Sequence, residues 1–339
     1  MDFNLDDTQQ DLRALAADLL AKEATQERLD AHEKTGLPYD DKVWQAMSQA
    51  GLTSVCVPES AGGAGLGAVE LAVVLREVGA RAAPVPALAT LVSTLAVARY
   101  GTPEQVTRSA EGIGTLALRE REPVSVERSG DGWLVSGRKT AVPHGGEAAY
   151  VLVTTGEGLF MTAGPWTARP EYASDGGGLA TVVLDRAPAE RLAGQEGVAH
   201  VRQLFTAAVA AQASGVLAGA LKLTTEYIRT RKQFGRALAE FQAVTVQIAD
   251  VYIAARALDV AMWSGAWLLA NDLPADEDVA VAGFHVSEAY RALFTCQHLH
   301  GGLGLDVTYP LHRYFAQAKH LSHLLGGADA QLDLIGALV

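Results

Sequence analysis

The stretch Arg231-Lys232-Gln233-Phe234-Gly235-Arg236, followed by Phe241-Gln242, lies between two long segments of helical period. Apolar residues recur three or four positions apart in these segments, which predicts two antiparallel helices joined by this stretch. Arg231 is suited to a bidentate contact with a phosphate, Phe234 to cover a flat heterocycle, and Gln242 to bond a nucleobase edge or ribose. The plainer alternative is a solvated basic turn, because charge clusters at helix ends are common.

Composition bounds the class of protein. The chain has 339 residues, is 49% hydrophobic and 19% charged, and carries a net charge of −12, which suits a large globular protein and argues against nucleic-acid binding. The first residues have no signal-peptide pattern, and the apolar stretch 88–98 is too short and too polar to span a membrane. Cys56 and Cys296 form no metal or redox motif, so free thiols are expected. These features predict a cytoplasmic protein without a membrane or nucleic-acid partner.

The first third of the chain has a helical pattern. One helix is expected to start at Asp6 or Asp7, and a second to run from Asp40-Asp41 to Gly51. Two further helices are expected to end at Val78 and at about Tyr100. The glycine-rich stretch 62–67 has the spacing GxGxG rather than GxGxxG, and no acidic residue follows about 20 positions on. It is therefore interpreted as a flexible loop that lines a cleft, not as a dinucleotide site.

The pattern changes to short β-type runs near residue 109. These runs are Leu116–Leu118, Trp133–Val135, Tyr150–Val153 and Thr181–Leu184, with glycine-rich turns between them. Helical periodicity returns near residue 198, and shorter helices are expected at Leu311–His323 and Asp329–Leu338. The predicted architecture is mainly α with an inserted β-domain: an N-terminal helical domain (1–108), a middle β-barrel (109–196) and a C-terminal helical bundle (197–339).

This arrangement resembles the acyl-CoA dehydrogenase family over nearly the whole chain. The resemblance rests on Arg-Lys-Gln-Phe-Gly-Arg, on the turn His298-Leu299-His300-Gly301-Gly302-Leu303-Gly304, and on stretches such as Ser136-Gly137-Arg138-Lys139 and Tyr309-Pro310-Leu311-His312-Arg313-Tyr314. It implies a C-terminal four-helix bundle, an acyl-CoA substrate, and FAD bound across a subunit interface.

The resemblance also implies which residues hold the cofactor. The positions that match the family's grip on the adenosine and pyrophosphate end of FAD are Arg231, Gln233, Phe234, Gln242, His298, Gly301 and Gly302. His298 stands where the family usually has glutamine. Glycine permits close backbone approach to phosphate oxygens, and arginine supplies their counter-charge.

Two departures from the family pattern concern the catalytic end. The family uses a glutamate to remove the α-proton of the thioester, a step that requires a positioned base. The two usual positions of that glutamate are here Leu325 and a site near Phe205, so no catalytic residue is assigned. The β-domain lacks the loop that contacts the flavin ring, and Ala141-Val142-Pro143-His144 replaces the usual Trp-Ile-Thr segment. The flavin pocket of this chain is therefore expected to be degraded.

The pattern is similar to the shorter, glutamate-lacking subunit of the heterotetrameric acyl-CoA dehydrogenases of bacterial steroid side-chain degradation. That resemblance implies a catalytic partner subunit and a steroid-CoA substrate. One alternative is a self-sufficient homo-oligomeric dehydrogenase with a relocated base, although Glu226, Glu240 and Asp250 are expected to be solvated helix carboxylates. Another is a non-enzymatic scaffold of the same fold. No metal is expected, since the histidines from His285 to His323 lack metal-ligand spacing.

Overall fold

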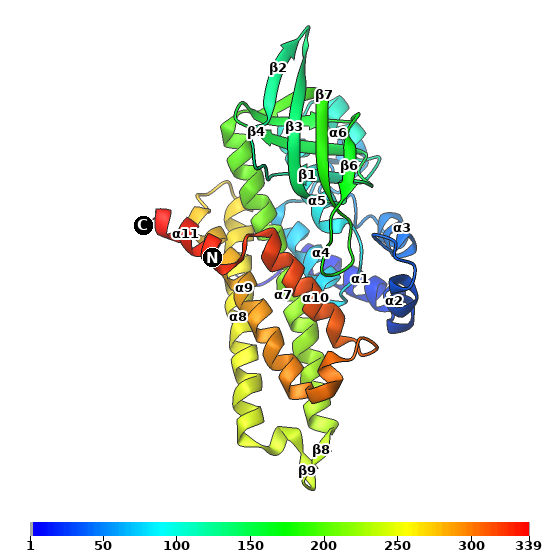
Figure 1. The fold of residues 1–339 in the computed structure, drawn as a ribbon, viewed down its shortest axis with the longest axis vertical. Coiled ribbons are helices and arrows are strands. Elements are labelled where there is room, and N and C mark those ends of the chain that lie inside the picture. The colour runs from blue at the N-terminus through cyan, green and yellow to red at the C-terminus, as the bar shows by residue number, and fades with distance from the viewer. Residues whose placement is uncertain (1–2, 339) are drawn as a thin grey trace. The chain divides into compact units, whose positions relative to one another are not determined.

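The structure is a computed structural model that describes residues 3–338 of the chain (Figure 1). It divides into two compact units. The first comprises Met1–Lys34, Ala72–Ala83 and Thr206–Val339, and the second comprises Thr35–Leu71 and Pro84–Phe205. The division into three domains at residues 108 and 196 stays a prediction beside these units.

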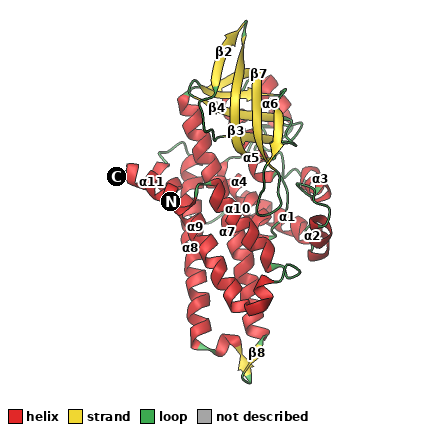
Figure 2. Cartoon of the chain, in the orientation of Figure 1, coloured by secondary structure: helices red, strands yellow, loops and turns green. Residues whose placement is uncertain are grey.

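The first unit is built from helices (Figure 2). Its elements are α1 (Asp7–Glu23), α2 (Gln26–Glu33), most of α4 (Ala68–Ala80), most of α7 (Gln195–Thr230), α8 (Gln242–Ala270), α9 (Asp276–His300), a 3-10 turn (Gly301–Leu305), α10 (Leu311–Leu324) and α11 (Gly327–Leu338), with the short strands β8 (Lys232–Gln233) and β9 (Arg236–Ala237) between α7 and α8. The bundle helices expected from periodicity are confirmed.

The second unit combines helices with a sheet. Its elements are α3 (Asp41–Gln49), a 3-10 turn (Glu59–Ala61), α5 (Ala87–Tyr100), α6 (Pro103–Ser109), β1 (Gly114–Ala117), β2 (Ser125–Ser129), β3 (Gly132–Pro143), β4 (Tyr150–Thr155), β5 (Gly158–Thr162), β6 (Thr167–Pro170) and β7 (Leu179–Ala193). The four strand runs expected from sequence are confirmed as parts of β1, β3, β4 and β7.

The helix boundaries follow from capping chemistry. Asp6 accepts a hydrogen bond from the backbone nitrogen of Gln9 (2.8 Å), and the Gln9 side chain accepts one from the Asp6 nitrogen (3.1 Å), which closes a capping box on α1. Gly51, with φ of 78°, follows the end of α3 in the left-handed conformation that glycine adopts without strain. The predicted start of α1 and end of α3 are therefore confirmed.

Helices α4 and α7 touch backbone to backbone in the first unit. A Cβ atom placed at Gly215 of α7 would overlap the carbonyl oxygen of Arg76 and lie 2.8 Å from the Ala80 nitrogen. One placed at Gly79 of α4 would overlap the carbonyl oxygen of Gln212. Only glycine at both positions permits this approach, because any larger residue would have to push the two helices apart.

Among residues 3–338, two helices are long and apolar enough to cross a membrane by length and average composition alone. Helices α7 and α8 each contain an 18-residue window that meets that description. In α7, 78% of the window is buried inside the protein, as in a core helix of a folded bundle; in α8 the share is 44%. Both helices are apolar on average but are interrupted by polar residues, so neither is a continuous apolar run.

The strands of the second unit form one sheet that curls back on itself. Neighbouring strands follow the order β1-β4-β5-β7-β3-β2, and β6 pairs with β7. Beyond the end of β1, Arg119 forms a bridge to Thr140 of β3, where the Thr140 nitrogen donates to the Arg119 carbonyl (2.9 Å). This bridge closes the path through β4, β5, β7 and β3 into a barrel around Val135, Val153, Phe160 and other buried side chains.

Candidate functional site

A β-hairpin with a two-residue turn joins α7 to α8 and carries Arg231, Gln233 and Phe234 of the predicted cofactor grip. In its turn, Phe234 has φ of 52° and Gly235 has φ of 81°. Two positive φ values in succession are those of a type I′ turn, the tight connection that suits the twist of two paired strands. The Leu238 nitrogen donates to the Arg231 carbonyl (2.9 Å) and closes the base of the hairpin. Figure 1 shows β8 and β9 at the end of α7 and α8.

Phe234 is exposed in a conformation that costs energy. Its side chain is 92% exposed, and an aromatic residue in the left-handed region is unfavourable by about 1–2 kcal/mol. Its ring makes an edge contact with Phe241 (6.4 Å between centroids), whose own ring lies 3.9 Å below the Arg236 guanidinium. Within the chain, these contacts bury little of Phe234, so the fold alone gives no reason for an aromatic residue here.

The polar members of the predicted grip are also exposed. Arg231, Gln233 and Gln242 lie on the surface of the hairpin and the first turn of α8. Within residues 3–338, their side chains have no hydrogen-bonding or ionic partner in the chain. A guanidinium and two amides in this state are available to an external anion or nucleotide.

The glycine turn after α9 is open on its outer side. Gly301 has φ of 60° and ψ of −138°, a conformation that essentially only glycine adopts. A Cβ atom at Gly301 or Gly302 would meet no atom within 4 Å. The surroundings therefore do not require glycine at 302, and the open space beside it would admit a close-lying ligand. His298 is exposed beside this turn.

One stack connects the hairpin to the glycine turn. Tyr227, one helical turn before Arg231, stacks on His300 with 4.4 Å between ring centroids and 21° between planes. The Tyr227 hydroxyl also donates to the His300 carbonyl (3.4 Å), immediately before Gly301. The sequence reasoning missed this pair; the available signal was an aromatic residue four positions before Arg231.

His300 is held by two further bonds. Its Nδ1 lies 2.8 Å from the Cys296 carbonyl, and its Nε2 lies 3.2 Å from the Tyr309 hydroxyl. A carbonyl only accepts, so Nδ1 carries the proton and Tyr309 donates to Nε2 in the neutral ring. Burial lowers the pKa of His300, opposed by the Cys296 carbonyl, which favours this neutral form.

Both positions expected for a catalytic base hold buried apolar side chains. Phe205 and Leu325 are each 7% exposed. Neither can accept a proton. The carboxylates considered as substitutes, Glu226, Glu240 and Asp250, are all exposed, as expected.

Several backbone and side-chain polar groups in and around the segment 141–144 are engaged within the barrel, although, in the part of the chain that the structure describes, His144 Nδ1 and Glu147 Oε2 are buried without a hydrogen-bond partner. Pro143 has neither an N–H nor a hydroxyl, and its carbonyl already accepts a hydrogen bond from Thr115. The His144 nitrogen donates to the Gly178 carbonyl (2.9 Å). The Lys139 ammonium is buried and bound by Glu120 and Thr154; burial lowers its pKa, opposed by Glu120. These groups serve the fold of the barrel.

Comparisons with known proteins place the chain in a family. Residues 6–114 match the acyl-CoA dehydrogenase N-terminal domain, and residues 202–339 match the acyl-CoA dehydrogenase C-terminal domain. The acyl-CoA dehydrogenase FadE28 of Mycobacterium tuberculosis is 38% identical over 88% of this chain and 92% of its own length. FadE27 of the same organism is 35% identical over 99% of this chain and 98% of its own.

Solved structures agree with these relatives. The ChsE4-ChsE5 complex from Mycobacterium tuberculosis has a chain with a TM-score of 0.94 and 35% identity, over 99% of this chain and 98% of that one. A variant of the Tcur3481-Tcur3483 steroid ACAD has a TM-score of 0.92 and 36% identity, over 98% and 97%. The chain belongs to the acyl-CoA dehydrogenase family.

Proposed function

We propose that this chain is the subunit of a heteromeric acyl-CoA dehydrogenase that supplies the adenosine and pyrophosphate half of the FAD site, while a partner subunit supplies the base. The observation that carries the proposal is the hairpin, with Arg231 at its base and Phe234 at its tip. Arg231 has no partner within the described chain, and Phe234 is 92% exposed in a strained conformation. Such a tip gains stabilising contacts only from something outside the chain.

FAD is the cofactor of this family, and the described residues fit one end of it. The unpaired guanidinium of Arg231 and the open glycine turn at Gly301-Gly302 suit a pyrophosphate, which needs positive charge and close backbone approach. Phe234, with Gln233, suits an adenosine. The β-domain does not offer the hydroxyl donors that the flavin ring receives in the family, because Pro143 stands at that position.

The chemistry follows from this division. When bound, FAD accepts the hydride that leaves the β-carbon of the acyl thioester. The α-proton must go to a base, and Leu325 and Phe205 leave this chain without one at either family position. The role of this chain is therefore to hold and orient the cofactor by its phosphate and adenosine end, and proton removal falls to the partner.

The relatives support a two-chain enzyme. Two similar structures are described as complexes of two different chains, ChsE4-ChsE5 and Tcur3481-Tcur3483, and the second is a steroid ACAD. By this similarity we propose a heterotetramer with two copies of each chain and a steroid side-chain CoA ester as substrate.

The test is FAD content, measured by absorbance and mass spectrometry, for the chain purified alone and co-purified with a candidate catalytic subunit. We expect FAD only in the complex, near one per heterodimer, and loss of that FAD in Arg231→Ala. One FAD per lone chain would contradict the shared site and point to a homo-oligomer with a relocated base. No FAD in either preparation, with Arg231→Ala assembling normally, would point to a scaffold.

A further inference from the structure

Two parts of the proposed grip come from distant parts of the sequence. Arg231 follows α7, whereas Gly301 and Gly302 follow α9. A ligand that spans both gains their full contribution only if the two parts keep a fixed spacing, because misplaced groups contribute little to binding. Whatever fixes that spacing also controls FAD binding, without touching FAD.

We propose that Tyr227, His300 and Tyr309 form a latch that positions the hairpin against the glycine turn; this inference rests on the proposed function. The ring of Tyr227 stacks on His300 at 4.4 Å, and its hydroxyl holds the carbonyl of the peptide that leads into Gly301. On the other side of the imidazole, the Tyr309 hydroxyl lies 3.2 Å from Nε2 of His300. The stack thus sets the position of the end of α7, and the two hydroxyls set the orientation of the turn.

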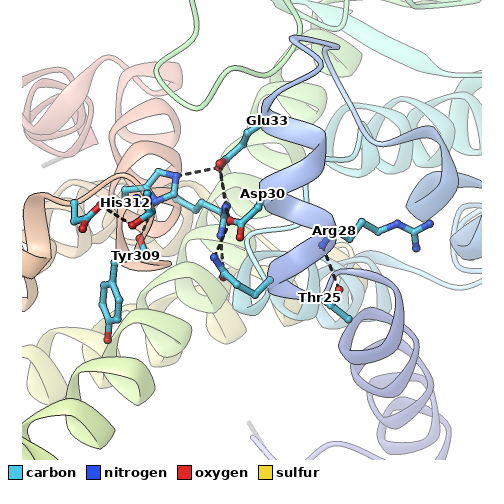
Figure 3. A network of polar contacts seen from close by, with 10 residues as sticks. Thr25, Arg28, Asp30, Glu33, Tyr309 and His312 are labelled. Carbon is cyan, nitrogen blue, oxygen red and sulfur yellow. Dashed lines mark hydrogen bonds and ion pairs between the residues drawn. The ribbon is translucent and has the colours of Figure 1, made fainter.

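The latch is anchored to α2, as Figure 3 shows. The Tyr309 carbonyl lies 2.8 Å from Nδ1 of His312, and Nε2 of His312 lies 3.0 Å from Glu33. The next residue, Arg313, is buried and binds Glu33 through Nε (2.6 Å) as well as Asp30. The segment that carries Tyr309 is therefore held at both its side chain and its backbone.

Tyr227, His300 and Tyr309 are not among the residues that we propose to contact FAD. They are positioning residues, and their loss is expected to weaken FAD binding more than it weakens the fold. Tyr309→Phe is the cleanest change, because it removes only the hydroxyl and leaves the ring beside His300. The matched control is Ser287→Ala, which removes a buried hydroxyl that bonds Ser322 (3.0 Å) between α9 and α10, away from the glycine turn.

The experiment titrates FAD into the flavin-depleted complex and follows flavin fluorescence, with thermal unfolding of each variant measured in parallel. We expect Tyr309→Phe to raise the dissociation constant of FAD about three- to tenfold, the effect of one lost hydrogen bond. Ser287→Ala should change that constant less than about twofold while lowering the unfolding temperature similarly. Tyr227→Leu, which removes the stack and keeps a good helix former, should weaken FAD binding at least as much as Tyr309→Phe.

Equal dissociation constants for Tyr309→Phe, Tyr227→Leu and Ser287→Ala would overturn the latch. Arg231→Ala separates this failure from a failure of the proposed function. If Arg231→Ala abolishes FAD binding and the latch variants do not affect it, only the latch is wrong. If Arg231→Ala also leaves FAD binding unchanged, the assignment of the grip itself is wrong, and the latch is overturned with it.

Discussion

The backbone contact between α4 and α7 gives a sharp prediction for the variant Gly215→Ala. The added methyl group would overlap the Arg76 carbonyl oxygen and lie 2.8 Å from the Ala80 nitrogen. Both obstacles are backbone atoms of a helix, which cannot turn aside as the end of a long side chain can. The two helices must therefore move apart, or one of them must distort.

The expected cost combines two opposing terms. Inserting a methyl group into a closely packed core costs about 1–3 kcal/mol, and the upper end applies where backbone must move. Alanine recovers about 1 kcal/mol of helix propensity relative to glycine. The net destabilisation is about 2 kcal/mol, which corresponds to a fall of about 4–8 °C in unfolding temperature at about 2–4 °C per kcal/mol.

The assay is thermal unfolding of Gly215→Ala beside a control, Gly336→Ala. Gly336 lies in α11, and a Cβ atom there would meet nothing within 4 Å, so the control should be neutral or stabilised by up to about 1 kcal/mol. An unfolding temperature for Gly215→Ala equal to or above that of the wild type would refute the direct backbone contact between α4 and α7.

Further outcomes follow from the same structure. Gly302→Ala should unfold like the wild type, because its methyl group meets no atom within 4 Å, yet the complex should lose FAD; retained FAD would remove Gly302 from the grip. Phe234→Gly should leave stability unchanged or raise it by up to about 1 kcal/mol, since it relieves a left-handed aromatic, while FAD content falls. Arg313→Met should lower the free energy of unfolding, measured by chemical denaturation, by about 2–3 kcal/mol. The loss is smaller than for breaking a fully buried ion pair because the Glu33 side chain is 42% exposed; an unchanged denaturation midpoint would contradict this. Burial lowers the pKa of His300 below 6.5, so its contribution to stability is present above that pH and is lost as the pH falls. When the pH is lowered from about 7.5 to about 5.5, the unfolding temperature of His300→Gln should therefore fall less than that of the wild type. An equal fall would argue against a neutral, buried imidazole.

The sequence predicted the elements whose burial pattern is regular. Helices α8 and α9 each pack one face on the bundle, so their apolar residues recur with the helical period. The strand Tyr150–Thr155 is buried along its whole length, and its central residues form an uninterrupted apolar run. These regularities survive in the sequence because tertiary packing and local pattern agree.

The elements that escaped prediction lack such a pattern. Helix α2 (Gln26–Glu33) buries only Leu29 and is held by Thr25 at its start and by Arg313 from far along the chain. Strand β2 (Ser125–Ser129) is an exposed edge strand that pairs with β3 alone. Short polar elements of this kind depend on distant partners, which spacing along the sequence does not show.

The site was predicted unevenly for a related reason. Each of the two parts of the proposed grip is continuous in sequence, so the motif containing Arg231 and Phe234 and the turn at Gly301-Gly302 were both visible. The latch joins Tyr227 to His300 across 73 positions, and nothing in the local sequence around either residue indicates that they are partners. A contact between elements so far apart in sequence becomes apparent only when the fold is known.

The turn at Phe234 separates what stabilises this chain from what the chain is for. Every free molecule carries the conformational cost of an exposed aromatic in the left-handed region, and within residues 3–338 the edge contact with Phe241 leaves the Phe234 ring almost fully exposed. An engineering screen that ranks variants of the isolated chain by heat resistance would favour glycine at position 234. It would thereby select against the very side chain through which we propose that the subunit meets its cofactor.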